Sequence, residues 1–214
     1  MVQILHKETG KTLLKASNDT IRGCVLSGHD LQNADFSGQD LSGCKITGCN
    51  LADADFAGAN LAHCEIGNSC LKRANLSGCQ LSHADLSDNS MEGATFVNCT
   101  ALETKFRHSK INQADFSRGD FSNADFFFAE LRSDFINAVL IGANLFGADL
   151  TQADFTRADL RNANMTDAKI ARAVFNFAEM AGAIGTNGQP WGFAVRPKPT
   201  KKPWWKVWNS NAAL

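Results

Sequence analysis

The 214-residue sequence predicts an all-β solenoid whose coils each have four sides. Two nested periods predict it. Phenylalanine recurs about every twenty residues, and the shorter pattern A-[DN]-[LF]-x-x recurs every five residues, as in residues 34–38 and 153–157. Sides of five residues within a coil of twenty give four equivalent sides, stacked as a repeat array. The phenylalanine column, with leucine at position 76, comprises Phe36, Phe56, Phe96, Phe116, Phe135, Phe155 and Phe175.

The central apolar residue of each pentapeptide, called position i, sets the register. It recurs every five residues from Ile21 to Leu131 and again from Phe135 to Met180, which gives about eight coils. The small residue at i−2 points to the same side because side chains alternate along a strand. Position i+2 is often Gly, Asn or Asp, which accept turn conformations at low cost, so we expect a corner there.

One four-residue step interrupts this register near Ser133 and Asp134. The phenylalanine column continues from Phe116 through Phe135 to Phe155. The number of sides is therefore expected to stay the same, and a single corner is expected to be one residue shorter.

The two ends of the repeat array, which covers residues 21–184, are expected to carry caps. An open solenoid would expose unpaired strand edges and a cut core. Residues 1–20 are expected to form the N-terminal cap, with two short strands at 2–7 and 12–16 around a turn at Thr9 and Gly10. The cap is predicted to be a hairpin covering the first coil.

Residues 185–214 form a C-terminal tail rich in Trp, Pro and Lys, expected to be irregular or briefly helical. Two interpretations remain open: the tryptophans make a cap or a homodimer contact, or the tail is a disordered extension. Clustering of the aromatic residues favours the contact. The candidate contact residues are Trp191, Trp204, Trp205 and Trp208.

Charge is distributed unevenly, although the formal net charge is only −1. Residues 21–184 contain 13 basic and 20 acidic residues, whereas residues 185–214 contain five basic residues and no acidic one. An acidic body argues against direct nucleic-acid binding, which needs a basic face. No apolar run has membrane-spanning length and no signal-peptide core is present, so we expect a cytoplasmic protein without membrane contact.

The A-[DN]-[LF]-x-x repeats of residues 21–184 resemble those of the pentapeptide repeat family. The resemblance implies a right-handed quadrilateral β-helix, with positions i and i−2 inside. Several members protect DNA gyrase and topoisomerase IV from quinolones or peptide toxins by imitating duplex DNA in shape and charge. Residues 100–108 are also similar to a segment of the quinolone-resistance members. The resemblance therefore implies a type II topoisomerase as one candidate partner.

The seven cysteines are interpreted as core residues rather than as a metal or disulfide site. Only Cys70 lies at i−1, and stacked cysteines at i−2 would point in parallel rather than toward each other. Buried cysteine behaves as a small apolar residue, so we expect free thiols and neither a metal nor a cofactor. The cysteines at i−2 are Cys24, Cys44, Cys49, Cys64, Cys79 and Cys99.

Two surface histidines, His63 and His83, are interpreted as solvated side chains rather than as metal ligands. His63 and His83 lie at outward i+2 positions, where solvated side chains are expected, because a metal site needs more ligands that converge. His29 lies at an i−2 position near the N-terminal end and is expected to point inward with a local adjustment under the cap.

A row of aspartates at i−1 is predicted along the phenylalanine side. Stacked like charges repel, so we expect these carboxylates either to be neutralised by nearby groups or to have a binding role. In one interpretation these side chains bond to backbone in the turns, with Arg118, Arg132, Arg157 and Arg161 neutralising nearby charge. In the other they form a stripe that mimics phosphates and binds a partner. The residues are Asp35, Asp55, Asp115, Asp134 and Asp154.

No pattern in the chain indicates catalysis. It has no nucleophile at recognisable spacing from a base and no phosphate-binding loop. The leading hypothesis is a non-enzymatic scaffold that presents a flat, moderately acidic surface to a protein partner. The alternative is a DNA mimic that binds DNA gyrase or topoisomerase IV and modulates topoisomerase poisons.

Overall fold

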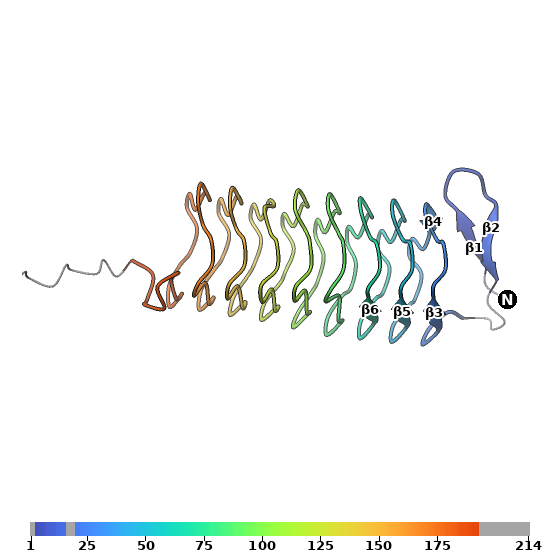
Figure 1. Ribbon diagram of the computed structural model, residues 1–214, viewed down its shortest axis with the longest axis horizontal. Coiled ribbons are helices and arrows are strands. Elements are labelled where there is room, and N and C mark those ends of the chain that lie inside the picture. The colour runs from blue at the N-terminus through green and yellow to red at the C-terminus, as the bar shows by residue number, and fades with distance from the viewer. Residues whose placement is uncertain (1–2, 16–19, 193–214) are drawn as a thin grey trace, which may run out of the picture.

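The computed structural model describes residues 3–15 and 20–192, which form a rod of stacked coils with a hairpin at one end (Figure 1). Successive coils pair in parallel with an offset of twenty residues, as between Asp30 and Asn50. Because each side is short, most pairing consists of single bridges, and no helix occurs among the described residues. The strands are β1 (Gln3–His6), β2 (Thr12–Lys15), β3 (Val25–Ser27), β4 (Ala34–Asp35), β5 (Lys45–Thr47) and β6 (Glu65–Gly67).

The corners follow the predicted register, with position i+2 in the left-handed conformation. Gly38 has a φ of 63°, and its N–H donates to the Ala57 carbonyl of the next coil at 2.8 Å. The same conformation occurs at Arg73 (φ 55°) and Phe128 (φ 51°), residue types that disfavour it. The inter-coil hydrogen bond thus imposes the corner even where the side chain does not favour it.

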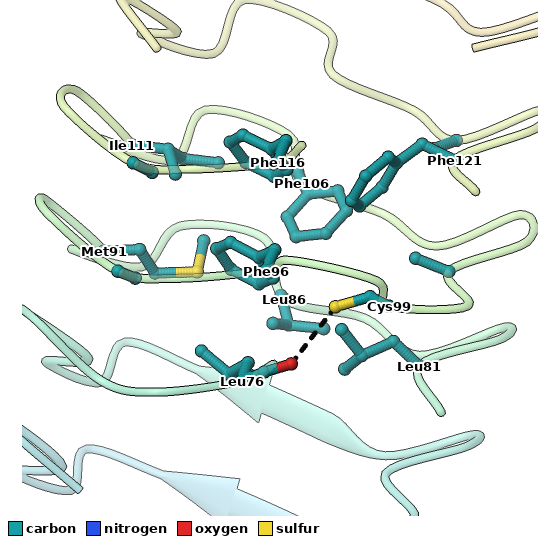
Figure 2. Close-up of a cluster of buried hydrophobic side chains, with 14 of the residues drawn as sticks. Leu76, Leu81, Leu86, Met91, Phe96, Cys99, Phe106, Ile111, Phe116 and Phe121 are labelled. Atoms are coloured by element: carbon teal, nitrogen blue, oxygen red, sulfur yellow. Dashed lines mark hydrogen bonds between the residues drawn. The ribbon is translucent and has the colours of Figure 1, made fainter. Parts of the chain in front are cut away.

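The phenylalanine column lies inside the rod. Its members from Phe36 to Phe155 are fully buried, and Phe175 near the C-terminal end is half-buried. Phe96 and Phe116 stack in parallel, with ring centroids 4.7 Å apart. Figure 2 shows these two rings among the leucines and other apolar side chains that fill the interior of neighbouring coils.

Five of the six i−2 cysteines are buried, Cys24 in the first coil is half-buried, and all seven thiols are free. They do more than fill space, because several donate to the carbonyl of a central residue one coil earlier. Cys79 Sγ donates to Phe56 O at 2.9 Å. Cys99 Sγ donates to Leu76 O at 3.1 Å, the bond that is dashed in Figure 2. Burial raises the pKa of the Cys79 thiol to about 12, so this thiol is protonated at neutral pH.

A hairpin lies at the N-terminal end. Strands β1 and β2 pair antiparallel, and β1 also pairs antiparallel with β4 through Leu5 and Asp35. The hairpin therefore provides hydrogen-bond partners for the strand edge of the first coil on the phenylalanine side. His29 keeps the i−2 place of the register, because its carbonyl accepts the Asn50 N–H at 3.0 Å, but its side chain is exposed rather than buried.

The C-terminal end of the described rod is covered by a short return of the chain. Ile184 and Pro190 form an antiparallel bridge, and Trp191 N–H donates to Ala183 O at 2.8 Å. The Trp191 ring lies 5.0 Å from that of Phe175, so it covers the last phenylalanine of the column. The other three candidate contact residues, Trp204, Trp205 and Trp208, lie outside the described residues.

Candidate functional site

The predicted row of aspartates follows the phenylalanine side in two blocks. Asp35 bridges Asp55 near the hairpin. Asp115, Asp134 and Asp154 bridge one another on three consecutive coils farther along. Asn75 and Thr95 occupy the equivalent positions in between, so the second block is the denser concentration of negative charge.

Four of the five aspartates bond to backbone in the turn that follows them. Asp35, Asp55, Asp115 and Asp154 each accept, through Oδ1, the N–H of the residue two positions later, at 2.8–2.9 Å. The hydroxyl and N–H of Ser37 also hold the pKa of Asp35 below its usual value. Asp134 is the exception, because its carboxylate accepts no hydrogen bond from any described residue.

The basic residues nearby do not neutralise this row. Arg132 pairs instead with Asp149, at 2.7 Å, and Arg161 with Asp159, at 2.6 Å, both outside the row. Arg118 donates to Asn98, and Arg157 forms no ion pair with a described residue of the row. The expectation that these arginines compensate the aspartates is therefore wrong for the described residues, and the phenylalanine side stays acidic.

Other parts of the rod surface balance their charges between coils. Lys45 pairs with Glu65 at 2.9 Å, and Lys105 lies 3.6 Å from Asp85. Arg73 forms a bidentate pair with Asp53 across the same twenty-residue step. Exposed pairs of this kind contribute little stability, but they cancel charge locally. Asp30, Asp40 and Asp120 on other sides also form no ion pair with a described residue, but only some aspartates there are unpaired, whereas the row on the phenylalanine side has no ion pair at any of its five positions.

The register slip lies beside the denser block of aspartates. Between Leu131 and Phe135 the chain lacks the i+2 residue that elsewhere has positive φ. Ser133 takes the inward i−2 place and is only 3% exposed. Its Oγ donates to the Ile111 carbonyl and accepts the Ala114 N–H. The inner structure is therefore kept while the corner is shortened.

The shortened corner opens a polar cleft of about 620 Å³ on the surface. At a regular corner the N–H of the i+2 residue donates to a carbonyl of the next coil, which here would be that of Thr151. Because the i+2 residue is missing, the Thr151 carbonyl has no donor among the described residues. The Ser133 N–H likewise has no acceptor within the described chain. Burial, and then the charges of neighbouring aspartates, raise the pKa of Asp134 above its usual value. The cleft is lined by Asn112, Gln113, Ala114, Arg132, Ser133, Asp134 and Gln152.

A cluster of aromatic side chains on another corner was not singled out from the sequence. Phe127 and Phe128 contact each other with ring centroids 4.6 Å apart, and Phe146 stacks on Phe127 at 5.6 Å. His108 lies 5.6 Å from Phe127. The sequence signal was available, because large aromatic residues occupy i+1 and i+2 positions where Ser, Thr, Arg, Gly or Asn is usual.

The two predicted surface histidines, His63 and His83, stack with ring centroids 5.1 Å apart. Within residues 3–15 and 20–192, no group of three or more His, Cys, Asp or Glu side chains could hold a metal ion. The described part of the chain also contains no helix long and apolar enough to cross a membrane. The cytoplasmic location stays a prediction.

Comparison with known proteins gives a family match. The family model described as Pentapeptide repeats matches in eight copies, with segments that together cover residues 40–118 and 120–184. No curated protein matches the sequence.

Solved structures with a similar chain course include three pentapeptide repeat or quinolone-resistance proteins. HetL of the cyanobacterium Nostoc sp. strain PCC 7120, involved in heterocyst differentiation regulation, is 24% identical over 81% of this chain and 94% of its own, with a TM-score of 0.45. Full-length QnrB1, a plasmid-mediated fluoroquinolone resistance protein, is 18% identical over 75% and 90%, with a TM-score of 0.47. Rfr23 of the cyanobacterium Cyanothece 51142 is 17% identical over 76% and 88%, with a TM-score of 0.25.

Proposed function

Because the chain belongs to the pentapeptide repeat family, we propose that it is a non-enzymatic scaffold whose phenylalanine side presents a flat, moderately acidic surface to a protein partner. The observation that carries the proposal is the uncompensated row of aspartates. None of Asp35, Asp55, Asp115, Asp134 and Asp154 forms an ion pair with a described basic residue, whereas other parts of the surface pair some of their charges. A face of one sign steers and orients a partner of the opposite sign.

The geometry of the rod supports this role. We propose that the coils close as a right-handed quadrilateral β-helix of about eight coils. Residues 30, 35, 40 and 45 each pair with the residue twenty positions later, which is the pattern of four sides per coil. Such closure gives each side a regular surface on which side chains repeat at strand spacing, roughly 4.8 Å.

The scaffold proposal is tested by neutralising the acidic row without disturbing its turns. Asparagine suits this purpose because Asn50 and Asn75 already make the same turn hydrogen bond in this chain. The variant carries Asp→Asn at the five positions of the row. Its matched control carries five Asp→Asn changes elsewhere on the surface, at residues 30, 40, 85, 120 and 159.

Each protein is then used for affinity capture, and the retained proteins are identified by mass spectrometry. A partner held by the unchanged chain and by the control, but lost with the row variant, supports the scaffold. Equal capture by all three proteins would refute a role for this face. Circular dichroism and thermal unfolding check that each variant is folded.

The second candidate function is a DNA mimic that binds DNA gyrase or topoisomerase IV. The block of Asp115, Asp134 and Asp154 on consecutive coils favours it, because duplex DNA also presents a regular line of negative charge. The test is gyrase supercoiling with added protein, with and without a quinolone. Absence of both inhibition and protection at micromolar protein would exclude this mechanism.

Self-association through the C-terminal segment is a further part of the proposal. Trp191 covers Phe175, and the proposed contact with a second copy is assigned to Trp204, Trp205 and Trp208, which lie outside the described residues. A chain that ends at Gly192 keeps the cap formed by residues 184–191 and lacks residues 193–214. Sedimentation of the two chains should show a dimer only for the full length, and equal masses would contradict the homodimer.

A further inference from the structure

The cleft at the shortened corner exists because one residue is absent from the edge of the rod. Gln113 on the coil before and Gln152 on the coil after both have left-handed corners, with φ of 61° and 66°. The coil between them contributes no residue at this position, and the cleft of about 620 Å³ lies there. A volume of this size is enough for a long side chain, whereas the corners around it are convex.

Three groups at the shortened corner have no hydrogen-bond partner in the described chain: the Asp134 carboxylate and the Ser133 N–H, whose residues line the cleft, and the carbonyl of Thr151, which precedes the lining residue Gln152. The Asp134 carboxylate lacks the turn hydrogen bond that Asp115 and Asp154 receive. The Thr151 carbonyl lacks the donor that most regular corners supply, as Gln152 N–H supplies Ala171 O at 2.9 Å. One donor, the Ser133 N–H, is also unpaired within the described chain. An occupant must therefore bring several donors and one acceptor.

Arg132, the cationic residue that lines the cleft, is already paired with another carboxylate. Arg132 donates to Asp149 Oδ2 from Nε at 3.2 Å and from Nη2 at 2.7 Å, so its guanidinium is directed to the neighbouring side. Asp134 meanwhile lies between Asp115 and Asp154, which add like charge on both sides. The cleft thus combines an open space with a carboxylate that nothing in the described chain neutralises.

We propose that this cleft is a binding site for an arginine side chain presented by a protein partner, an inference that rests on the scaffold function proposed above. The guanidinium would form a bidentate pair with the Asp134 carboxylate and donate a further N–H to the Thr151 carbonyl. The peptide carbonyl next to the arginine would accept the Ser133 N–H.

Arginine fits this set of groups better than a metal ion or lysine. A metal needs ligands that converge on one point, and no three such groups do so among the described residues. Lysine offers a compact charge without a planar fork, whereas the guanidinium carries five donors that match a carboxylate and a second acceptor at once. Charge-assisted bidentate pairs are also the stronger hydrogen bonds.

The test uses the full chain, labelled with ¹⁵N, and the tripeptide acetyl-Ala-Arg-Ala-amide as the probe. Its twin contains citrulline, which has a similar shape without the charge. We expect saturable NMR shifts at the Ser133 N–H and at the side-chain amides of Gln113 and Gln152, with the arginine peptide only. The same signals should stay in place with the citrulline twin.

Two variants test the contribution of the cleft to arginine binding, one by removing a charge and one by restoring the missing residue. Asp134→Asn removes the charge and should weaken binding at least about tenfold, the effect of one charge-assisted hydrogen bond. Inserting one glycine between Arg132 and Ser133 restores the five-residue step and supplies the missing N–H, so it should abolish binding although every side chain remains. Asp120→Asn, at a regular corner and outside the acidic row, is the matched control and should leave the affinity unchanged.

The outcomes separate the cleft from the acidic face as a whole. If the glycine-insertion and Asp134→Asn variants bind the arginine peptide as tightly as the unchanged chain, or if equal shifts occur near Asp35 and Asp115, the arginine site is overturned and the scaffold proposal still stands. Localised binding at Ser133 without any partner that depends on the acidic row would support the site and refute the scaffold. If the insertion variant does not fold, Asp134→Asn alone decides the matter.

Discussion

Two corners on neighbouring coils of the same edge show what one residue contributes to this rod. At residues 150–155 the chain turns through Gln152 in the left-handed conformation, and the Asp154 carboxylate bonds to the following turn. At residues 131–135 the left-handed residue is absent, and Asp134 has no such bond from the described chain. The parallel bridges between Asp115, Asp134 and Asp154 nevertheless continue across both corners.

The comparison teaches that the interior and the surface respond differently to a deletion. The interior repeats because each phenylalanine stacks on the next, and Phe116 and Phe135 stack across the slip with ring centroids 4.6 Å apart. The corner is joined to the next coil by a backbone hydrogen bond, so removing its residue leaves an unpaired carbonyl and a cleft. A slip in a solenoid therefore changes the surface chemistry while the core stays regular.

The strongest test of this comparison is truncation of the core on each side of the slip. Phe116→Ala and Phe135→Ala should each lower the free energy of unfolding by about 3–5 kcal/mol, because both rings are fully buried in the stack. Urea unfolding measures both values. A much smaller loss for Phe135 would show that the slip loosens the core as well as the corner.

The next test concerns the serine that replaces alanine at the inward place of the shortened corner. Ser133→Ala should cost about 1–3 kcal/mol, because it removes the hydroxyl that donates to Ile111 O and accepts the Ala114 N–H. Ser77, on the outward side of a regular coil, is the control, and Ser77→Ala should change stability by less than about 0.5 kcal/mol. Equal costs would mean that the Ser133 hydroxyl does not support the corner.

Glycine substitution sharpens the comparison of backbone conformation. Gln152→Gly should raise the free energy of unfolding by about 1 kcal/mol, because glycine accepts positive φ without the steric cost of a side chain. Arg132→Gly should lower it instead, since this residue has no positive φ and its pair with Asp149 is lost. Chemical denaturation of both variants gives the sign of each change in unfolding free energy. Changes of the same sign would contradict the conclusion that the shortened corner lacks its left-handed i+2 residue.

The smallest expected effects are electrostatic and have opposite signs at the two kinds of aspartate. Asp134 has a raised pKa in the folded protein, so its ionisation destabilises the fold above that pKa and has no effect below the pKa of the unfolded chain. Asp134→Asn should therefore stabilise the protein at pH 7 by less than about 0.5 kcal/mol, since the group is exposed and screened. The gain should disappear as the pH falls through the folded-state pKa.

Asp35 behaves in the opposite way. Its pKa is lowered by the Ser37 hydroxyl and N–H, so its ionised form stabilises the fold above the unfolded pKa and the contribution is lost as the pH falls through the lower, folded-state pKa. Asp35→Asn should thus slightly destabilise the protein at pH 7 and have no effect in strong acid. Thermal unfolding between pH 3 and pH 7, roughly across the carboxylate range, compares the two variants. Parallel pH profiles would contradict the difference between the corners.

Much of the site could be placed from the sequence, but its chemistry could not. The register puts Asp134 on the phenylalanine side and locates the slip beside it. Which aspartates accept turn hydrogen bonds, and that Arg132 turns to Asp149, depend on side-chain rotamers that the repeat does not specify. The register does not predict the aromatic corner around Phe127, because it specifies the inward residues and leaves the outward i+1 and i+2 positions free to vary.

The sequence by itself determined the period, the register, the inward residues and the position of the shortened corner. It could do so because coils stack on identical neighbours, so a fixed spacing in sequence becomes a fixed spacing in space. Only the tertiary structure decided which charges are paired, which thiols donate hydrogen bonds, and that the missing residue leaves a cleft. These features arise between coils, where a side chain has several possible hydrogen-bond or ion-pair partners about twenty residues away. Which partner it binds depends on interatomic distances in the folded rod and not on spacing along the chain.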